Sequence, residues 1–446
     1  MDGSLPHPLN ALKKAALRAV HPSTLLEEAL ELRENRLSLK GATAFVPLDQ
    51  GIAVFGAGKA SACMAQALEQ HLGTWIVDGL VITKEGHGTH LQRILVREAA
   101  HPVPDTRTLE ATRELLERLQ QQPPGRPVLF LLSGGASSLL ELPREGITLE
   151  DLQRTTDLLL RSGAPIQAIN AVRKHLSRVK GGQLLRFIRG PVWTLVISDV
   201  VGNAPEVIGS GPTVPDPSTY QDALDVLHTY HLIDAVPSSV YNLLLRGSRG
   251  ELPETLKGLD VHPYDTMYHI LADPFTAARA AEEEARRHGY HAVILNATVT
   301  GQTHEVARFL VDALHSVGRY GVPVPSPACL ILAGETTLEV HGSGKGGRNQ
   351  EFALYAGLLL EQDELDAQVM ALGTDGTDGP TDAAGAWISR SILHRARAQG
   401  ISPEAYLEQQ DSYTFFQKIG TQIRTGPTCT NVCDLMVGCV GRPRDI

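Results

Sequence analysis

Hydrophobic residues along the chain fall into short continuous runs that alternate with amphipathic stretches. The apolar runs predict strands at 51–56, 79–83, 93–98, 127–133, 191–198, 291–296, 328–334, 336–340 and 368–373. Stretches with a helical repeat of apolar positions predict helices at 60–73, 108–122, 274–289 and 303–318. Strands without polar alternation are typical of a parallel sheet that is buried on both faces. The pattern therefore predicts an α/β protein whose helices cover a mostly parallel sheet.

The length of the chain, 446 residues, exceeds what one ordinary core holds and predicts two domains, with three as the alternative. The stretch 246–263 carries glycines and prolines, and the alternation of strands and helices restarts after it. We therefore expect an N-terminal domain at 1–262 and a C-terminal domain at 263–446. The first 20 residues predict a polar lead into an amphipathic helix, and no apolar run reaches the roughly 18 residues of a membrane span.

The composition narrows the class of protein. Hydrophobic residues make up 42% of the chain and charged residues 20%, which is typical of a soluble globular protein. A net charge of −10 argues against general nucleic-acid binding, which needs a basic surface. The five cysteines are widely spread and form no zinc motif, so we expect a reduced, cytoplasmic setting. The sequence does not fix the oligomeric state, and a homodimer is one option.

The stretch FGAGKAS, 55–61, follows a predicted strand and resembles a phosphate-binding turn. It is not a Walker A loop, because Ala53 stands where that motif needs its first glycine and Ala60 where it needs a hydroxyl. A dinucleotide fingerprint that begins at Gly56 would need a third glycine where Ser61 stands. Neither motif is complete.

Two features of this turn still point to an anion. Gly56 and Gly58 would let backbone amides approach phosphate oxygens at a helix start, and Lys59 adds a positive charge there. Asp78 stands at about the distance along the chain that a ribose contact requires, which keeps the dinucleotide interpretation open. A plain strand-to-helix turn with a surface lysine is the structural alternative.

A second glycine-rich turn follows the predicted strand 127–133. Its glycines clear space, while its hydroxyls and the first helical amides can donate hydrogen bonds to phosphate oxygens. The candidate nucleotide-binding residues here are Ser133, Gly134, Gly135, Ser137 and Ser138. A tight turn with serine N-caps is the alternative.

Five basic residues crowd into positions 173–180 of this acidic chain. If the segment is helical, Arg173 and Lys180 share one face because they are seven residues apart. They could receive a substrate carboxylate, for which arginine offers a two-pronged match. A solvated helix face is the alternative, and we expect His175 to be structural.

An acidic residue, Asp199, ends the predicted strand 191–198, at the edge where open α/β sheets bind ligands. One carboxylate is enough for Mg²⁺, which relies on substrate phosphates for other ligands. An aspartate that caps a turn is the alternative.

Two further candidate stretches lie in the C-terminal part. Arg348 follows two glycines at a predicted helix start. The loop after strand 368–373 holds Asp375, Asp378 and Asp382, which could bind a metal or act on a substrate hydroxyl. No glutamate stands at the twelfth position from Asp375, so the loop is not an EF-hand.

Taken together, these stretches resemble the class II glycerate 2-kinases, whose C-terminal part is called the MOFRL domain. The matching motifs are GAGKAS, LLSGGASSLL, VRKHLSRVKGG, ISDVVG, GSGPTVPDPSTY, AGETT, GGRNQEFAL and GTDGTDGPTDAAGA. The resemblance implies transfer of a phosphoryl group from ATP to the 2-hydroxyl of D-glycerate, with Mg²⁺. It also implies a Rossmann-like α/β/α N-terminal domain, a second α/β domain, and an active site in the cleft between them.

The resemblance assigns roles to residues of this chain. The family's conserved lysine falls on Lys59 and its conserved arginine on Arg348. We expect both to act on the transferring phosphoryl group, with Asp375 or Asp378 aligning the attacking hydroxyl and Asp199 orienting Mg²⁺. Where family members often carry an acid, this chain has Asn203.

Two other functions fit parts of the sequence. An NAD(P)H-dependent hydroxypyruvate reductase would use the near-fingerprint at Gly56 and Gly58. A non-catalytic regulator that binds a phosphate ligand would use the same loops without chemistry.

Overall fold

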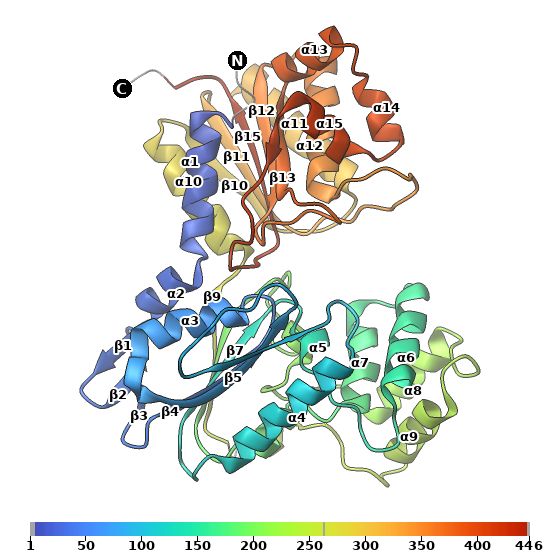
Figure 1. The fold of residues 1–446 in the computed structure, drawn as a ribbon. Coiled ribbons are helices and arrows are strands. Elements are labelled where there is room, and N and C mark those ends of the chain that lie inside the picture. Colours follow the sequence, from blue (N-terminus) through green and yellow to red (C-terminus); the bar gives the residue numbers. More distant parts are fainter. Residues whose placement is uncertain (1–4, 262–263, 444–446) are drawn as a thin grey trace. The chain divides into compact units, whose positions relative to one another are not determined.

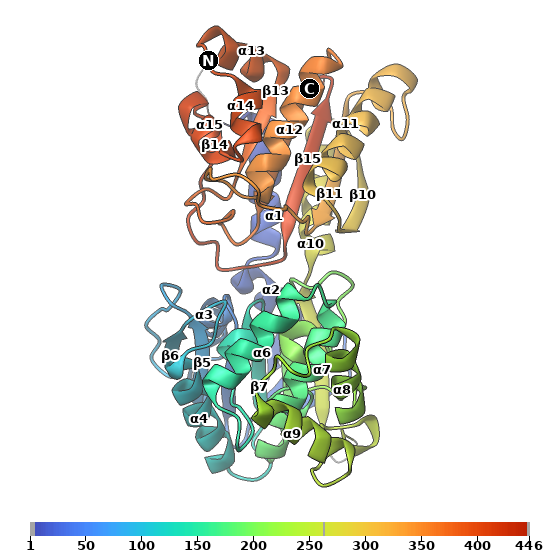
Figure 2. The same cartoon turned by 90° about the vertical axis from the view of Figure 1, so that its right-hand side faces the viewer.

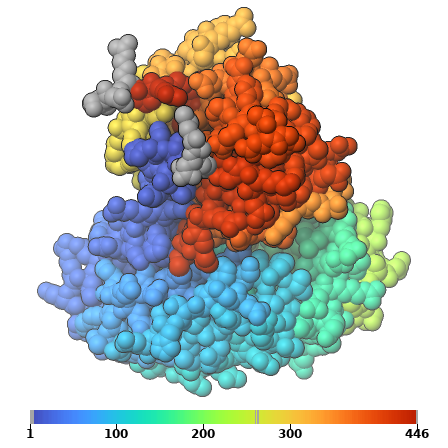
Figure 3. All heavy atoms as spheres, turned by 45° about the horizontal axis from the view of Figure 1, so that its top comes forward, coloured from blue at the N-terminus to red at the C-terminus, as the bar shows by residue number. Residues whose placement is uncertain are grey.

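The computed structural model describes residues 5–261 and 264–443, which group into two compact units (Figure 1). Residues 25–271 form what we call the N-terminal unit, and residues 5–24 with 272–443 form the C-terminal unit. The sequence placed the first helix in the N-terminal domain. The structure instead groups α1 (His7–Ala19) with the C-terminal unit, because α1 packs on α10 (Pro274–Arg287), seen as blue against yellow in Figure 3.

A six-stranded sheet organises the N-terminal unit. Its strands lie in the order β6-β5-β4-β7-β8-β9, with bounds β4 (Ile52–Ala57), β5 (Ile76–Lys84), β6 (Leu95–Ala99), β7 (Val128–Ser133), β8 (Val192–Ile197) and β9 (Thr266–Ala272). The pairs β6/β5, β5/β4, β4/β7 and β7/β8 are parallel. The order reverses between β4 and β7, which is the switch point where doubly wound sheets bind ligands.

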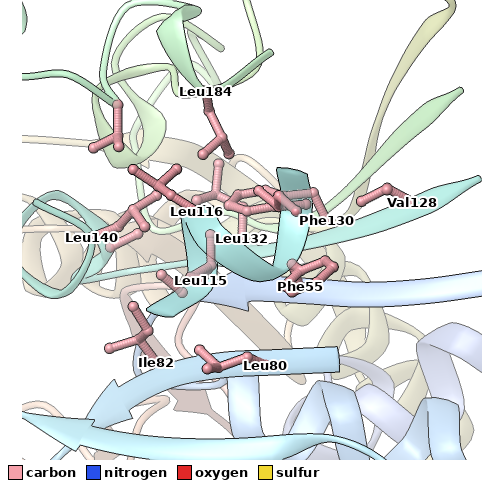
Figure 4. Packing of buried hydrophobic residues seen from close by; sticks show 14 of the residues in the cluster. Phe55, Leu80, Ile82, Leu115, Leu116, Val128, Phe130, Leu132, Leu140 and Leu184 are labelled. Atoms are coloured by element: carbon pink, nitrogen blue, oxygen red, sulfur yellow. The ribbon is translucent and has the colours of Figure 1, made fainter. Parts of the chain in front are cut away.

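The core of this unit explains the apolar runs. Phe55, Phe130 and Leu132 project from neighbouring strands onto Leu115 and Leu116 of α4 (Thr106–Gln121) (Figure 4). The helix α3 (Ser61–Leu72) packs on the same sheet through its contacts with β4, β5 and β7. Burial of one such side chain contributes roughly 1.5–3 kcal/mol. Every residue of β4, β7 and β8 is buried, as a parallel sheet covered on both faces requires.

Smaller elements complete the N-terminal unit. A helical region has its own apolar cluster around Tyr220 and consists of α6 (Leu149–Arg161), α7 (Ile166–Leu176), α8 (Tyr220–Thr229) and α9 (Ser238–Ser248). The short helix α5 (Ala136–Leu139) follows β7 directly. A three-stranded antiparallel sheet is formed by β1 (Leu30–Arg33), β2 (Arg36–Leu39) and β3 (Phe45–Pro47), after α2 (Pro22–Ala29).

The C-terminal unit contains a second six-stranded sheet, in the order β10-β11-β15-β12-β13-β14. Its bounds are β10 (His291–Val299), β11 (Ala328–Gly334), β12 (Ala367–Gly373), β13 (Gly385–Ser389), β14 (Gln422–Ile423) and β15 (Asp434–Val440). Only β10 and β11 are parallel among these described pairs. Helices α10 and α1 lie on one face, and α11 (Thr303–Tyr320) and α12 (Arg348–Gln362) on the other (Figure 2). The unit also contains α13 (Arg390–Ala398), α14 (Pro403–Glu408) and α15 (Ser412–Ile419).

The predicted fold class is confirmed, although the two six-stranded sheets also contain β9, β13 and β14, which the apolar runs did not predict. The predicted strand 336–340 is wrong: after β11 ends, Thr337 makes a single bridge to Gln302 and no strand forms. The strand β15 was not predicted, although it lies between β11 and β12 in the middle of the sheet. Among residues 5–261 and 264–443, no helix combines the length and apolar character that a bilayer crossing requires.

Candidate active site

The two glycine-rich turns interlock at the switch point of the N-terminal sheet. The Lys59 amide donates a hydrogen bond to the Gly134 carbonyl oxygen (2.8 Å), and the Ala60 amide donates to Ser133 Oγ (3.0 Å). A Cβ at Gly135 would lie 2.9 Å from the His101 ring and 3.3 Å from Lys59 Cγ. The turn after β4, the turn after β7 and the loop after β6 therefore meet around Lys59, because all three follow the carboxyl ends of strands in one parallel sheet.

A glycine at position 58 is required by both its conformation and its surroundings. Gly58 has a φ of +136°, which L side chains rarely adopt, and an added Cβ would collide with Ser133. Ser133 is fully buried, and its hydroxyl satisfies the amide of Ala60 at the start of α3. Ser133 therefore holds the turn after β4 in place, while Lys59 is only half-buried.

The turn after β7 is held in place by two cations and by three serine hydroxyls. Arg173 and Lys180 both donate to the Ser137 carbonyl oxygen, each at 2.8 Å. Ser138 Oγ donates to the Pro102 carbonyl oxygen (2.6 Å), and Ser137 Oγ lies 3.0 Å from Ser210 Oγ. The serines of this turn are thus tied to the loops that follow β6 and β8.

Lys180 does not present a free ammonium to a substrate, as the sequence had led us to expect. Its Nζ donates to the carbonyl oxygens of Ser137 and Leu140 and pairs with Glu141 (3.1 Å), and both charged side chains are buried. Burial lowers the pKa of Lys180 to about 8, with Glu141 acting in the opposite direction. Lys180 closes the carboxyl end of α5, so it positions the turn.

The helical spacing assumed for Arg173 and Lys180 is also wrong. Helix α7 ends at Leu176, and Lys180 lies beyond it in an irregular segment. The two side chains still meet at Ser137 because the chain folds back after the helix. Two further basic residues of the cluster are structural, since Lys174 pairs with buried Asp216 (3.1 Å) and His175 Nε2 with Glu254 (3.0 Å).

The loop after β8 contributes to the same edge of the sheet. Asp199 follows the end of β8 and is half-buried. Asn203 adopts a left-handed φ of +55°, which an asparagine tolerates better than most residues. Ser210, at φ +62°, donates to Asn170 Oδ1 (3.1 Å) and links this loop to α7. Asp199 is therefore at the ligand edge, as predicted.

The position of Asp78 does not support the dinucleotide interpretation. Asp78 pairs in register with Ala53 at the start of β4, so it lies at the opposite end of the strand from the turn that begins after Ala57. Its carboxylate accepts hydrogen bonds from Arg118 (2.8 Å) and Gln122 (2.6 Å) of the α4 region. At about 3.3 Å per residue, Asp78 is roughly four residues too far along the sheet to meet a ribose at the turn.

A cavity of about 290 Å³ adjoins the turn after β7. Ser138 and Arg173 line it on one side, and Leu152, Leu160 and Ile166 supply apolar walls. Its mixed lining could receive a small organic group next to this turn.

In the C-terminal unit, Arg348 is the first residue of α12 and is held by two carboxylates. Its Nε lies 2.6 Å and its NH2 group 3.1 Å from the two oxygens of Asp434, and its NH1 group pairs with Glu335. Asp434 begins β15 and pairs in register with Gly334 and Gly373, the last residues of β11 and β12. The sheet thus fixes the carboxylate that orients the arginine.

Electrostatics keep Arg348 charged. Burial would lower its pKa, but Asp434 and Glu335 raise it above the ordinary value. Burial raises the pKa of Asp434 to about 6, against the opposing effect of Arg348. Nearby, Asn349 Oδ1 and Gln350 Oε1 are buried without a hydrogen-bond partner among the described residues. A bound ligand with a hydroxyl group could satisfy such acceptors.

The three predicted acids of the loop after β12 have different partners. Asp378 is buried and accepts hydrogen bonds from the Asn349 amide (2.9 Å) and the Gln350 amide (2.8 Å) at the start of α12. Asp375 is half-buried and accepts from the Thr377 amide (3.0 Å), while exposed Asp382 pairs with Arg424 (3.3 Å). The expectation that the three could act together as metal ligands is not met.

Gly347 explains why Asp378 can cap α12. An added Cβ at this position would collide with the Asp378 carboxylate, so only glycine admits the acid so close to the helix start. Burial raises the pKa of Asp378, whereas its hydrogen bonds to Asn349 and Gln350 act to lower it. Asp378 is therefore structural. Asp375, which follows the end of β12 and caps no helix, is the better candidate for chemistry than exposed Asp382.

Sequence reasoning missed three acids that hold the candidate cations: Glu141, Glu335 and Asp434. Each carries a recognisable signal. Glu141 interrupts an apolar run, Glu335 directly follows the strand β11, and Asp434 directly precedes the apolar run of β15. Acids at the ends of buried strands seldom lie there without a partner.

The chain matches two known protein families and several known proteins. The family described as Domain of unknown function (DUF4147) matches residues 8–245, and the MOFRL family matches residues 328–434. The chain is similar to the glycerate 2-kinase of Pyrococcus horikoshii, with 40% identity over 432 residues that cover 96% of both chains. A crystal structure of a glycerate kinase from Thermotoga maritima superposes with a TM-score of 0.85 at 39% identity, covering 97% of this chain and 98% of that one.

One further relative bears on the alternative function. A protein of Agrobacterium vitis is 39% identical over 391 residues, covering 87% of both chains, and its name gives hydroxypyruvate reductase as a provisional activity only.

Proposed function

The chain belongs to the glycerate 2-kinase family, and from that premise we propose that it transfers a phosphoryl group from ATP to the 2-hydroxyl of D-glycerate, giving 2-phosphoglycerate and ADP. The observation that carries the proposal is the pair of interlocked turns at the switch point, with Lys59 between them. Such turns supply amides and a cation to phosphate oxygens.

Phosphoryl transfer asks the protein mainly to position charged oxygens and to neutralise them. We assign the nucleotide phosphates to the turn 133–138 and the transferring group to Lys59 and Arg348. Ser133 and Lys180 hold that turn in shape, so their contribution is to positioning. Arg173, which reaches Ser137 from α7, is the remaining candidate of the basic cluster for the glycerate carboxylate.

The acids have separate assignments. Asp375 is the candidate for aligning the attacking hydroxyl, because Asp378 is committed to the start of α12. In the described part of the chain, no three acidic, histidine or cysteine side chains are placed to hold a metal ion. A single carboxylate, Asp199, fits Mg²⁺ that arrives with ATP and takes its other ligands from phosphate and water. When bound, the ion would neutralise charge on the phosphate oxygens.

The test is a coupled assay that distinguishes 2-phosphoglycerate from 3-phosphoglycerate, run on the wild type and on Lys59→Ala. We expect 2-phosphoglycerate from the wild type, and a fall in kcat of about 10²–10³-fold for the variant with little change in the KM for ATP, because Lys59 acts on charge that develops in the transition state. Lys40→Ala, at an exposed lysine beyond β2, is the matched control and should keep full activity.

Two results would overturn the proposal: oxidation of NADH with hydroxypyruvate but no ADP release with glycerate, or an unchanged kcat in Lys59→Ala.

A further inference from the structure

A second and larger cavity of the N-terminal unit has a volume of about 650 Å³ and is lined by four arginines, Arg144, Arg178, Arg186 and Arg246. None of the residues from the two turns lines it in the described part of the chain. Because the whole protein carries a net charge of −10, four guanidinium groups around one cavity indicate a candidate binding site for an anion.

Three of the four arginines have no carboxylate partner within the described residues. Arg144 donates to the side-chain oxygen of Gln183 (2.7 Å) and has a buried Nε without a hydrogen-bond partner. Arg186 donates only to the backbone oxygen of Glu254 (3.0 Å), and Arg178 is exposed. Guanidinium groups bound only to neutral acceptors keep their full charge available to a ligand.

The neighbouring charges do not cancel this excess. Arg246 pairs with Glu251 (3.2 Å), and Glu145 is the acid that shares the lining. Burial lowers the pKa of Arg144, and the charges of Arg186 and Arg178 lower it further, while Tyr220 and Glu254 act in the opposite direction. The arginines therefore repel one another, and a bound anion would relieve that repulsion.

We propose that this cavity binds a small organic phosphate that carries a second anionic group. Two or more arginines match two anionic groups, each of which can accept a pair of parallel hydrogen bonds. Phe187, Leu243 and Leu252 supply apolar walls for a carbon skeleton. The volume lies within the range of small-molecule sites and is much larger than one inorganic phosphate needs.

The cavity is separate from the two turns, and one segment of the chain connects it to the turn after β7. The segment 177–183 lies between the cavity and the turn after β7: Arg178 lines the cavity, whereas Lys180 reaches the turn. Gln183 accepts from Arg144 and donates to the Lys180 carbonyl oxygen (2.9 Å), so one side chain touches both sides. The proposal of this site does not rest on the reaction proposed above.

Binding of pyrophosphate in the absence of magnesium tests the site by calorimetry and thermal unfolding of the full chain. The variants are Arg178→Glu, at an exposed position that should leave the fold intact, and the double variant Arg178→Glu with Arg186→Gln. Arg161→Glu, at an exposed arginine of α6 that pairs with Asp157, is the matched control. Lys59→Ala separates this site from the turns.

We expect the wild type, Arg161→Glu and Lys59→Ala to bind pyrophosphate at this site, and we expect at least a tenfold weaker affinity in Arg178→Glu and a further loss in the double variant. Equal binding in wild type and both Arg178 variants would overturn the proposal. So would binding that disappears completely in Lys59→Ala, because all of it would then belong to the turns. Neither outcome depends on turnover, so the kinase proposal stands or falls separately.

Discussion

Lys59 and Arg348 are both cations beside glycines, but their surroundings differ. Arg348 is clamped by Asp434 and Glu335, which fix its plane and offset its charge. Lys59 is held through its backbone, by the hydrogen bond from its amide to Gly134. The arginine is therefore oriented before any ligand arrives, and lysine at position 348 could not reproduce contacts to both carboxylates.

Asp434 should make stability depend on pH. Its pKa in the folded protein is about 6, above the ordinary 3.8, because it is buried. A raised pKa contributes stability that is fully present below about 3.8 and is lost as pH rises through 6. We expect the unfolding free energy of the wild type, relative to Asp434→Asn, to fall by at most about 3 kcal/mol from pH 4 to pH 7.

Denaturant unfolding of the two proteins across that range measures this difference. A difference that is constant with pH, or one that grows as pH rises, would show that Arg348 holds the Asp434 carboxylate ionised throughout.

At the scale of elements, the start of α12 depends on an acid from another loop. Asp378 accepts hydrogen bonds from the amides and side chains of Asn349 and Gln350, and therefore serves as an N-cap that is distant in sequence. The same helix start presents Arg348. The geometry of the candidate arginine thus rests on a carboxylate that does no chemistry itself.

This division of roles predicts opposite outcomes for two neighbouring acids. Asp378→Ala should lower the unfolding free energy by about 2 kcal/mol, because four hydrogen bonds at a buried helix start lose their acceptor. Asp375→Ala should lower kcat and have a smaller effect on stability, since Asp375 is only half-buried and caps no helix, and it accepts hydrogen bonds from Thr377 of its own loop. Chemical denaturation and steady-state kinetics on both variants separate the two roles, and equal effects on stability would refute the assignment.

At the scale of the whole molecule, the proposal requires residues of two compact units to serve one reaction. If Lys59 and Arg348 act on the same phosphoryl group in the same transition state, their contributions are coupled. We expect Lys59→Ala and Arg348→Ala each to lower kcat by about 10²–10³-fold. The kcat of the double variant should be only slightly lower than that of the less active single variant.

A double-mutant cycle on kcat measures that coupling. Arg390→Ala is the matched control, because Arg390 is also the first residue of a helix in the C-terminal unit. Losses that multiply in the double variant would mean that the two cations act independently.

The sequence by itself determined the α/β class and the strands β4, β7, β8 and β12, behind which several of the candidate residues lie. Continuous apolar runs such as those of β4, β7 and β11 indicate strands that are buried on both faces. Glycines that follow such runs indicate turns at the sheet edge where ligands bind. These are local properties, so a single segment is enough to reveal them. The segment 336–340 shows where a local pattern fails to predict structure. Its residues look like a strand, but its described pairing is the single bridge between Thr337 and Gln302.

Only the tertiary structure decided which candidates are held by buried partners. Lys180 is bound by Ser137, Leu140 and Glu141, and Asp378 by the start of α12, and nothing in the sequence indicated these partners. The physical reason is that the partner of a buried charge comes from a segment far away in the chain, and its identity depends on how the strands are ordered. For example, β15 lies between β11 and β12, and this strand order brings Asp434 into contact with Arg348.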